Sequence, residues 1–209
     1  MNLFDPDSKI IQFFQTLGGL IILNLCFVVC CIPVVTIGAA WTAMYTVTLQ
    51  EADDRSGSIL SRYFHAFCAN FGKATGLWLL LLLLGGTLGY NYLFLTANPS
   101  LDIGVFRGLL IALSIVYTMI CTFAFPLLSR FENTVMGTLR NSLALAIGHL
   151  PKTVLMALIN LLPALILLLS ESLFWRLSIF LVMIYFAVAA QINSLILIKI
   201  FRRFTEKQA

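Results

Sequence analysis

The chain has 209 residues, of which 60% are hydrophobic and 11% are charged. Soluble globular proteins carry about 25% charged residues, so this composition excludes an ordinary soluble domain. The formal net charge of +4 is spread in small groups between apolar stretches, and this distribution argues against a nucleic-acid-binding surface.

Charged residues are absent from five long stretches of the chain. A helix needs about 20 apolar residues to cross a hydrocarbon core about 30 Å thick, and every stretch meets or approaches that length. The pattern therefore predicts an all-α, polytopic transmembrane helix bundle that occupies residues 1–209 as a single membrane domain. The uncharged stretches are 10–50, 74–101, 108–129, 153–170 and 177–198.

The first uncharged stretch is too long for one span, because 41 helical residues would extend about 60 Å. Pro33 should end the helix, since proline lacks a backbone N–H and clashes with the preceding turn. We expect a span over 15–32, a break from Pro33 to Gly38, and a short interfacial helix over 39–50. This gives five spans in total. If 33–50 crosses the membrane as well, there are six spans.

The segment after this stretch has the composition of a helix that lies in the membrane interface. Over 58–71, aromatic and aliphatic residues recur at helical spacing, and polar and basic residues occupy the other side. Residues 134–150 repeat the pattern less strongly. The remaining spans are predicted at 75–97, 108–129, 153–170 and 177–198.

The two interfacial segments also suggest an internal duplication. Residues 67–73 align with 146–152, so that Lys73 falls on Lys152 and each lysine opens a span. Each half would then contain an interfacial helix followed by a two-span hairpin, as in parallel transporter repeats. The alternative is that any two leucine-rich hairpins look alike.

Small and polar residues inside the spans indicate how the helices pack. Gly85 and Gly89 form a GxxxG pattern, which lets another helix approach closely. Polar side chains at this depth more often form interhelical hydrogen bonds than line a path for a neutral solute. They are Asn24, Asn91, Asn160, Gln191 and Asn193.

Residues that would carry chemistry are sparse. Coupled transporters usually place an ionisable residue inside the membrane, and these apolar stretches contain none. His65 and His149 lie in different segments without carboxylates at ligand spacing, and no phosphate-binding glycine motif occurs. We therefore expect no enzyme, no cofactor site and no metal site.

The basic residues between the stretches indicate an orientation. Successive segments hold one, three, one, three, one and four Lys or Arg residues. Because cytoplasmic loops are richer in basic residues than external ones, we expect 51–73, 130–152 and the C-terminal tail inside the cell. Five spans place the N-terminus outside.

Three passages of the chain resemble the YesL family of bacterial integral membrane proteins, whose domain has no known function. They read PVVTIGAAWTAMY at 33–45, FHAFCANFGK at 64–73 and FPLLSRFENT at 125–134. The resemblance implies a multi-pass protein of the bacterial cytoplasmic membrane. It also implies an association with carbohydrate import, because genes of this family often lie beside carbohydrate ABC importers.

The resulting hypothesis is a non-enzymatic accessory subunit for carbohydrate or oligosaccharide import. Its partners would be the lipid bilayer and either ABC importer subunits or further copies of itself, but not nucleic acid. Alternatives are a small oligomeric transporter or channel for a neutral solute, and a membrane sensor or assembly factor. The candidate partner-docking residues are Arg62, Lys73, Arg130, Glu132 and Asn133.

The orientation gives a direct prediction. A reporter of location fused after Ala209 should indicate the cytoplasm. The same reporter fused at Met1 should indicate the outside of the cell. A cytoplasmic reporter at both ends would contradict the five-span topology and favour six spans.

Overall fold

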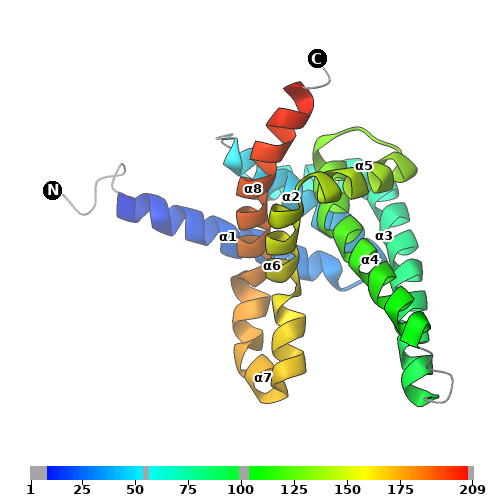
Figure 1. The fold of residues 1–209 in the computed structure, drawn as a ribbon. Helices are drawn as coiled ribbons and strands as arrows, with labels where there is room; N and C mark the ends of the chain where they lie inside the picture. The colour runs from blue at the N-terminus through cyan, green and yellow to red at the C-terminus, as the bar shows by residue number, and fades with distance from the viewer. Residues whose placement is uncertain (1–8, 54–56, 99–103, 207–209) are drawn as a thin grey trace.

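The structure is a computed structural model that describes residues 9–53, 57–98 and 104–206. These residues form helices and no strands, and Figure 1 shows their arrangement. A short 3₁₀ turn, Val34–Thr36, follows α1, and a π-helical segment, Leu181–Tyr185, joins α7 to α8. The α-helices are α1 (Lys9–Cys31), α2 (Ile37–Ala52), α3 (Ile59–Ala97), α4 (Gly104–Arg130), α5 (Val135–Gly148), α6 (Leu150–Leu169), α7 (Glu171–Phe180) and α8 (Phe186–Glu206).

Five helical segments of the described chain are long and apolar enough to cross a membrane, in agreement with the sequence-based prediction of five spans. They are Phe14–Cys31, α3, α4, α6 and the continuous segment Glu171–Arg202. Figure 1 shows two antiparallel hairpins, α3–α4 and α6–α7–α8, whose turns lie at the same end of the molecule. A parallel two-hairpin repeat would produce this arrangement. Helix α1 runs across the hairpins instead of alongside them.

Helix α2 begins after a break at Pro33. Helix α1 ends at Cys31, and the hydroxyl of Thr36 donates to the carbonyl of Cys30 at 2.5 Å, which satisfies one of the groups left open at the helix end. The indole N–H of Trp78 donates to the carbonyl of Val34 at 2.8 Å. These bonds fix the turn between α1 and α2 against α3.

The sequence predicted an interfacial helix over 39–50. In the structure, helix α2 covers this segment and lies inside the bundle. Ten of its 16 residues are buried, and it contacts α1, α3, α4 and α8. An interfacial helix needs one apolar and one polar face, whereas α2 carries small or apolar residues on most of its surface. That composition suits a helix that is surrounded on most sides, and the interfacial prediction is corrected accordingly.

The boundary predicted between 58–71 and 75–97 is also absent, because α3 runs through both segments without interruption. In the segment that the predicted duplication pairs with this one, α5 and α6 are separate helices. Pro151 stands at the start of α6, and the equivalent position in the first half is Gly72. Proline is well suited to the first turn of a helix, so the break between α5 and α6 falls beside Pro151.

Two glycines mark close approaches between helices. A Cβ atom at Gly38 would overlap the carbonyl oxygen of Ala74 and lie 2.5 Å from Cβ of Trp78, so the backbone of α2 packs directly against the backbone of α3 there. A Cβ at Gly85 would lie 2.5 Å from the hydroxyl oxygen of Tyr117 on α4. A Cβ at Gly89 would have no described atom within 4 Å, so the structure shows the expected close approach at Gly85 alone.

Replacing Gly38 should therefore destabilise the bundle. Gly38→Ala should lower the free energy of unfolding by about 1–3 kcal/mol, because the added methyl group overpacks the α2–α3 contact. Thermal unfolding in mild detergent measures this. Gly86→Ala is the matched control, since a Cβ there meets no described atom within 4 Å. Equal melting temperatures for the two variants would contradict the packing.

Candidate functional site

The ends of three helices meet at an aspartate. Asp53 follows the last residue of α2, and its Oδ2 accepts from Nη1 of Arg130, at the end of α4, at 2.6 Å. Its Oδ1 lies 3.4 Å from Nη2 of Arg202 on α8. The hydrogen bond from Arg130, with a smaller contribution from Arg202, lowers the pKa of the Asp53 carboxyl. The three segments predicted to be cytoplasmic are thus joined at one end of the bundle.

A second ion pair links Glu51 on α2 to Arg62 on α3. The Arg62 side chain is only 16% exposed, and its guanidinium also donates to the carbonyl of Gly57 at 3.2 Å. Two of the five candidate docking residues, Arg62 and Arg130, therefore form ion pairs within the fold. Lys73 and Glu132 are exposed and Asn133 is partly exposed, so these three remain accessible to a partner.

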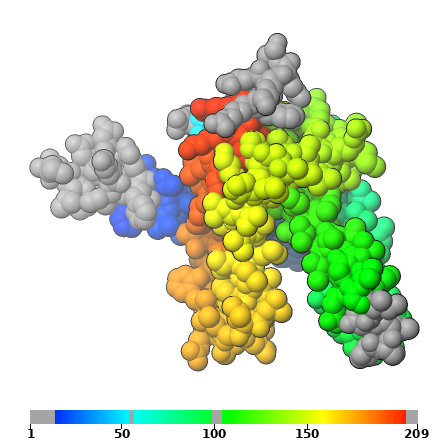
Figure 2. Space-filling model, in the orientation of Figure 1, coloured from blue at the N-terminus to red at the C-terminus, as the bar shows by residue number. Residues whose placement is uncertain are grey.

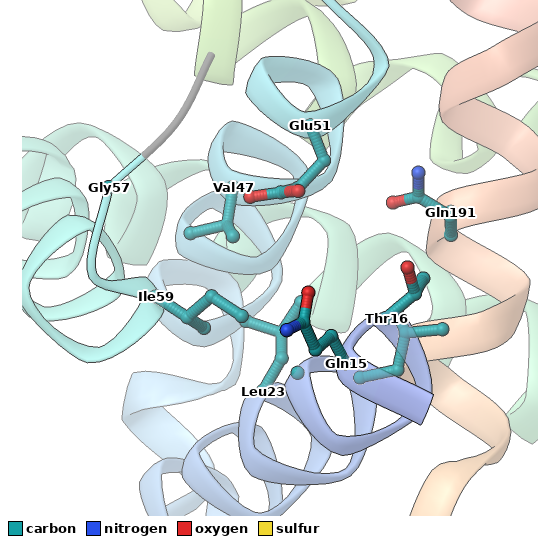
Figure 3. A pocket seen from close by; sticks show the side chains of 10 residues that line it. Gln15, Thr16, Leu23, Val47, Glu51, Gly57, Ile59 and Gln191 are labelled. Atoms are coloured by element: carbon teal, nitrogen blue, oxygen red, sulfur yellow. The ribbon is translucent and has the colours of Figure 1, made fainter. Parts of the chain in front are cut away.

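A polar cavity of about 460 Å³ lies beside these ion pairs (Figure 3). Its walls come from α1, α2, α8 and the start of α3. Figure 3 shows that the Glu51 carboxylate and the side chains of Gln15, Thr16 and Gln191 surround the same space. The Gln191 Oε1 atom is buried and has no hydrogen-bond partner among the described residues. The sequence indicated Gln191 as a polar residue at depth, but it did not indicate the cavity.

The predicted interhelical hydrogen bonds are present at Asn160 and Asn193. The Asn193 Nδ2 group donates to Oδ1 of Asn160 at 2.8 Å and lies 3.2 Å from the hydroxyl of Tyr45. The hydroxyls of Thr48 and Ser194 lie 2.8 Å apart. These contacts join α2, α6 and α8 in the interior, and they favour packing over a solute path for these two asparagines.

Asn24 interacts with the backbone of the π-helical segment. Its Nδ2 donates to the carbonyl of Val182 at 2.6 Å, and its Oδ1 accepts from the N–H of Ala187 at 2.8 Å. Those two backbone groups are five residues apart, which is the spacing that a π-helical bond would close. The carboxamide therefore inserts into the hydrogen-bond ladder and connects α1 to α8.

An aromatic cavity of about 230 Å³ lies between α2, α3, α4 and α6. It adjoins a larger apolar cleft of about 530 Å³ between the two hairpins, and the two spaces share Thr118, Ala157 and Leu161. Figure 2 shows the surface hollowed between α4 and α6. The cavity is lined by Trp41, Tyr45, Trp78, Leu81, Tyr117, Thr118, Cys121, Thr122, Phe125, Ala157, Asn160 and Leu161.

Among the described residues, no three or more His, Cys, Asp or Glu side chains gather as a metal-binding group. The structure is that of a multi-pass membrane helix bundle that contains the polar cavity and the aromatic cavity described above. Residues 20–92 match the model of the family described as "Protein of unknown function, DUF624". This is the YesL-like domain family, and the match includes two of the three passages that carry the resemblance. No curated protein and no solved structure matches the chain.

The ion pairs of Asp53 predict a pH dependence. The pKa of Asp53 in the folded chain lies below its ordinary value of about 3.9, so the ion pairs add stability above that value. This contribution is lost as the pH falls through the folded pKa. The melting temperature of the wild type should therefore drop more steeply from pH 6 to pH 3 than that of Asp53→Asn.

The matched control is Glu132→Gln, which removes an exposed carboxylate near the same end. This variant should keep the pH dependence of the wild type. The same pH dependence in Asp53→Asn and in the wild type would show that the three helix ends are not held by this aspartate.

Proposed function

We propose that this protein is a non-enzymatic accessory subunit of a carbohydrate import system in the bacterial cytoplasmic membrane. Its C-terminus would lie in the cytoplasm and its N-terminus outside. The observation that carries the proposal is an exposed apolar surface on α3 and α5, at the end of the bundle where the basic segments gather. The carbohydrate part of the proposal rests on the family resemblance.

The exposed surface, which we call the docking surface, combines apolar and charged side chains. Phe64 on α3 is 48% exposed, and Met136 on α5 is 64% exposed. Leu60, Phe71 and Ile147 are also exposed on these two helices, which contact each other. Apolar patches bordered by polar residues are typical of protein–protein or membrane contacts. Exposed charged side chains are Lys73 on α3, Arg140 on α5 and Glu132 in the turn before α5.

The distribution of charge supports a role without coupled transport or catalysis. The apolar stretches of the spans contain no ionisable carboxylate or base that could carry a proton or a cation across the membrane. The ion pairs of Asp53 and Glu51 lie near helix ends, where they hold the fold together. Charges placed in this way suit a subunit that positions other proteins.

A transporter for a neutral solute is the second candidate, and the polar cavity favours it. That cavity offers two amides, a hydroxyl and one carboxylate to a ligand, and the acceptor atom of Gln191 has no described partner. Amide and hydroxyl groups of this kind could bind an uncharged polar solute.

Co-purification in mild detergent tests the accessory role. The tagged wild type should recover a permease or ATPase subunit of an importer, and tagged importer should recover this protein in return. Phe64→Ala combined with Met136→Ala should reduce recovery at least fivefold, because it removes one large exposed apolar side chain from each helix of the docking surface. Leu93→Ala with Ile179→Ala is the control, since both side chains are exposed on other helix faces.

Purification of the wild type without any importer subunit would contradict the accessory role. Solute flux into proteoliposomes that contain only this protein would favour the second candidate instead.

A further inference from the structure

We propose that the aromatic cavity and the apolar cleft together bind one neutral amphiphile, with a hydroxyl-bearing ring in the cavity and a hydrocarbon chain in the cleft. An alkyl glycoside has this chemistry. The inference goes beyond the proposed function and does not depend on it, because ligand binding and importer association can each fail alone.

Five of the twelve residues that line the cavity are aromatic. The ring of Trp41 stacks on Tyr45 with centroids 5.8 Å apart, and it packs edge-on against Phe27 at 4.7 Å. The rings of Trp78 and Phe125 lie 6.5 Å apart on another wall. The face of an aromatic ring carries partial negative charge, so it attracts the C–H groups of a saturated ring stacked on it.

Polar groups in the wall can orient such a ring. The indole N–H of Trp78 donates to a backbone carbonyl, whereas that of Trp41 donates to no other described residue. Asn160 lines the same space, and its oxygen accepts from Asn193. An amide has further hydrogen-bonding positions beyond that one. A few placed polar groups within apolar walls are typical of small-molecule sites.

The position of the cavity favours an uncharged ligand. Asn160 lies ten residues into α6, or about 15 Å from the start of that helix, which is half of a hydrocarbon core about 30 Å thick. Neither the cavity nor the cleft is lined by a charged residue. An ionised ligand would lose its hydration there without a counter-charge, whereas hydroxyl groups can be satisfied by amide and indole groups.

The cleft explains how the chain of the ligand would be held. It is lined mainly by aliphatic side chains of α4 and α6, including Ile111, Ile115, Val154 and Leu158, and it opens at the surface between the hairpins. The cleft and the cavity share lining residues, so one ligand can place its hydrocarbon chain in the cleft and its ring in the cavity. Ala157 lies at the junction.

Tryptophan fluorescence provides a local readout. The protein has three tryptophans, and two of them line the cavity. Trp175 is 65% exposed on α7, so Trp175→Phe leaves only the two cavity tryptophans. This protein in lipid nanodiscs would be titrated with n-octyl-β-D-glucoside below its micelle concentration, and with octanol, glucose and octyltrimethylammonium at matched concentrations.

The glucoside should cause a saturable change in fluorescence, with a Kd at least tenfold lower than that of any comparator. Ala157→Phe should abolish the change, because its ring fills the junction between cavity and cleft. Ala112→Phe, on an exposed face of α4, should leave it intact. Asn160→Leu should raise the Kd for the glucoside at least fivefold. This variant should still elute as a folded protein in size-exclusion chromatography.

Each of the other outcomes would overturn the proposal. Equal binding of octanol would mean that the cavity is only an apolar space for hydrocarbon. Equal binding of the cationic amphiphile would show that the site does not select uncharged ligands. Equal binding of glucose would show that the cleft contributes nothing to binding. A linear, non-saturating response to the glucoside would show partition into lipid without a site.

Discussion

The fold depends on burying α2 among the other helices of the bundle. Lipid chains are as apolar as leucine, so helices in a bilayer gain little from hydrophobicity alone and associate through close packing and hydrogen bonds. Helix α2 meets this constraint with small residues, among which Ala39, Ala40 and Ala43 are completely buried. Its threonines remain compatible with the interior because their hydroxyls bond locally, as Thr42 does to the carbonyl of Gly38 at 2.9 Å.

The same helix separates the two cavities. Trp41 and Tyr45 are four residues apart, so they share one face of α2, and both line the aromatic cavity. Val47 and Glu51 share a different face by the same spacing, and both line the polar cavity. Beyond its last residue, α2 leads into Asp53, where α4 and α8 end. A shift of α2 would therefore alter the shape of both cavities and the geometry of the Asp53 ion pairs at the same time.

The sequence predicted the elements of this structure better than their arrangement. Long uncharged stretches reveal spans because charge is costly in hydrocarbon, and Pro33 reveals a break because the cause is local. The location of α2 is not a local property, since a short helix rich in alanine and threonine could lie at an interface or in a core. Only the surrounding helices decide between these places.

The candidate sites were harder to predict for the same reason. Asn24 was recognised as polar at depth, but its backbone partners lie 158 and 163 residues further along the chain. The docking hypothesis selected five residues from two segments, and it could not indicate that Arg62 and Arg130 form ion pairs within the fold. The aromatic cavity draws its walls from four helices, and no spacing in the sequence brings those rings together.

Cross-linking α2 to α8 tests the central position of α2 most directly. In a variant whose five cysteines are replaced by serine or alanine, Thr48→Cys and Ser194→Cys would be combined, because the two native hydroxyls lie 2.8 Å apart. Mild oxidation in membranes should convert most of this protein to a disulfide-linked form that migrates faster without reductant. A control pairing Thr48→Cys with Leu83→Cys, on an exposed face of α3, should not cross-link. Rapid labelling of Thr48→Cys by a water-soluble maleimide, with no cross-link to position 194, would contradict the buried position of α2.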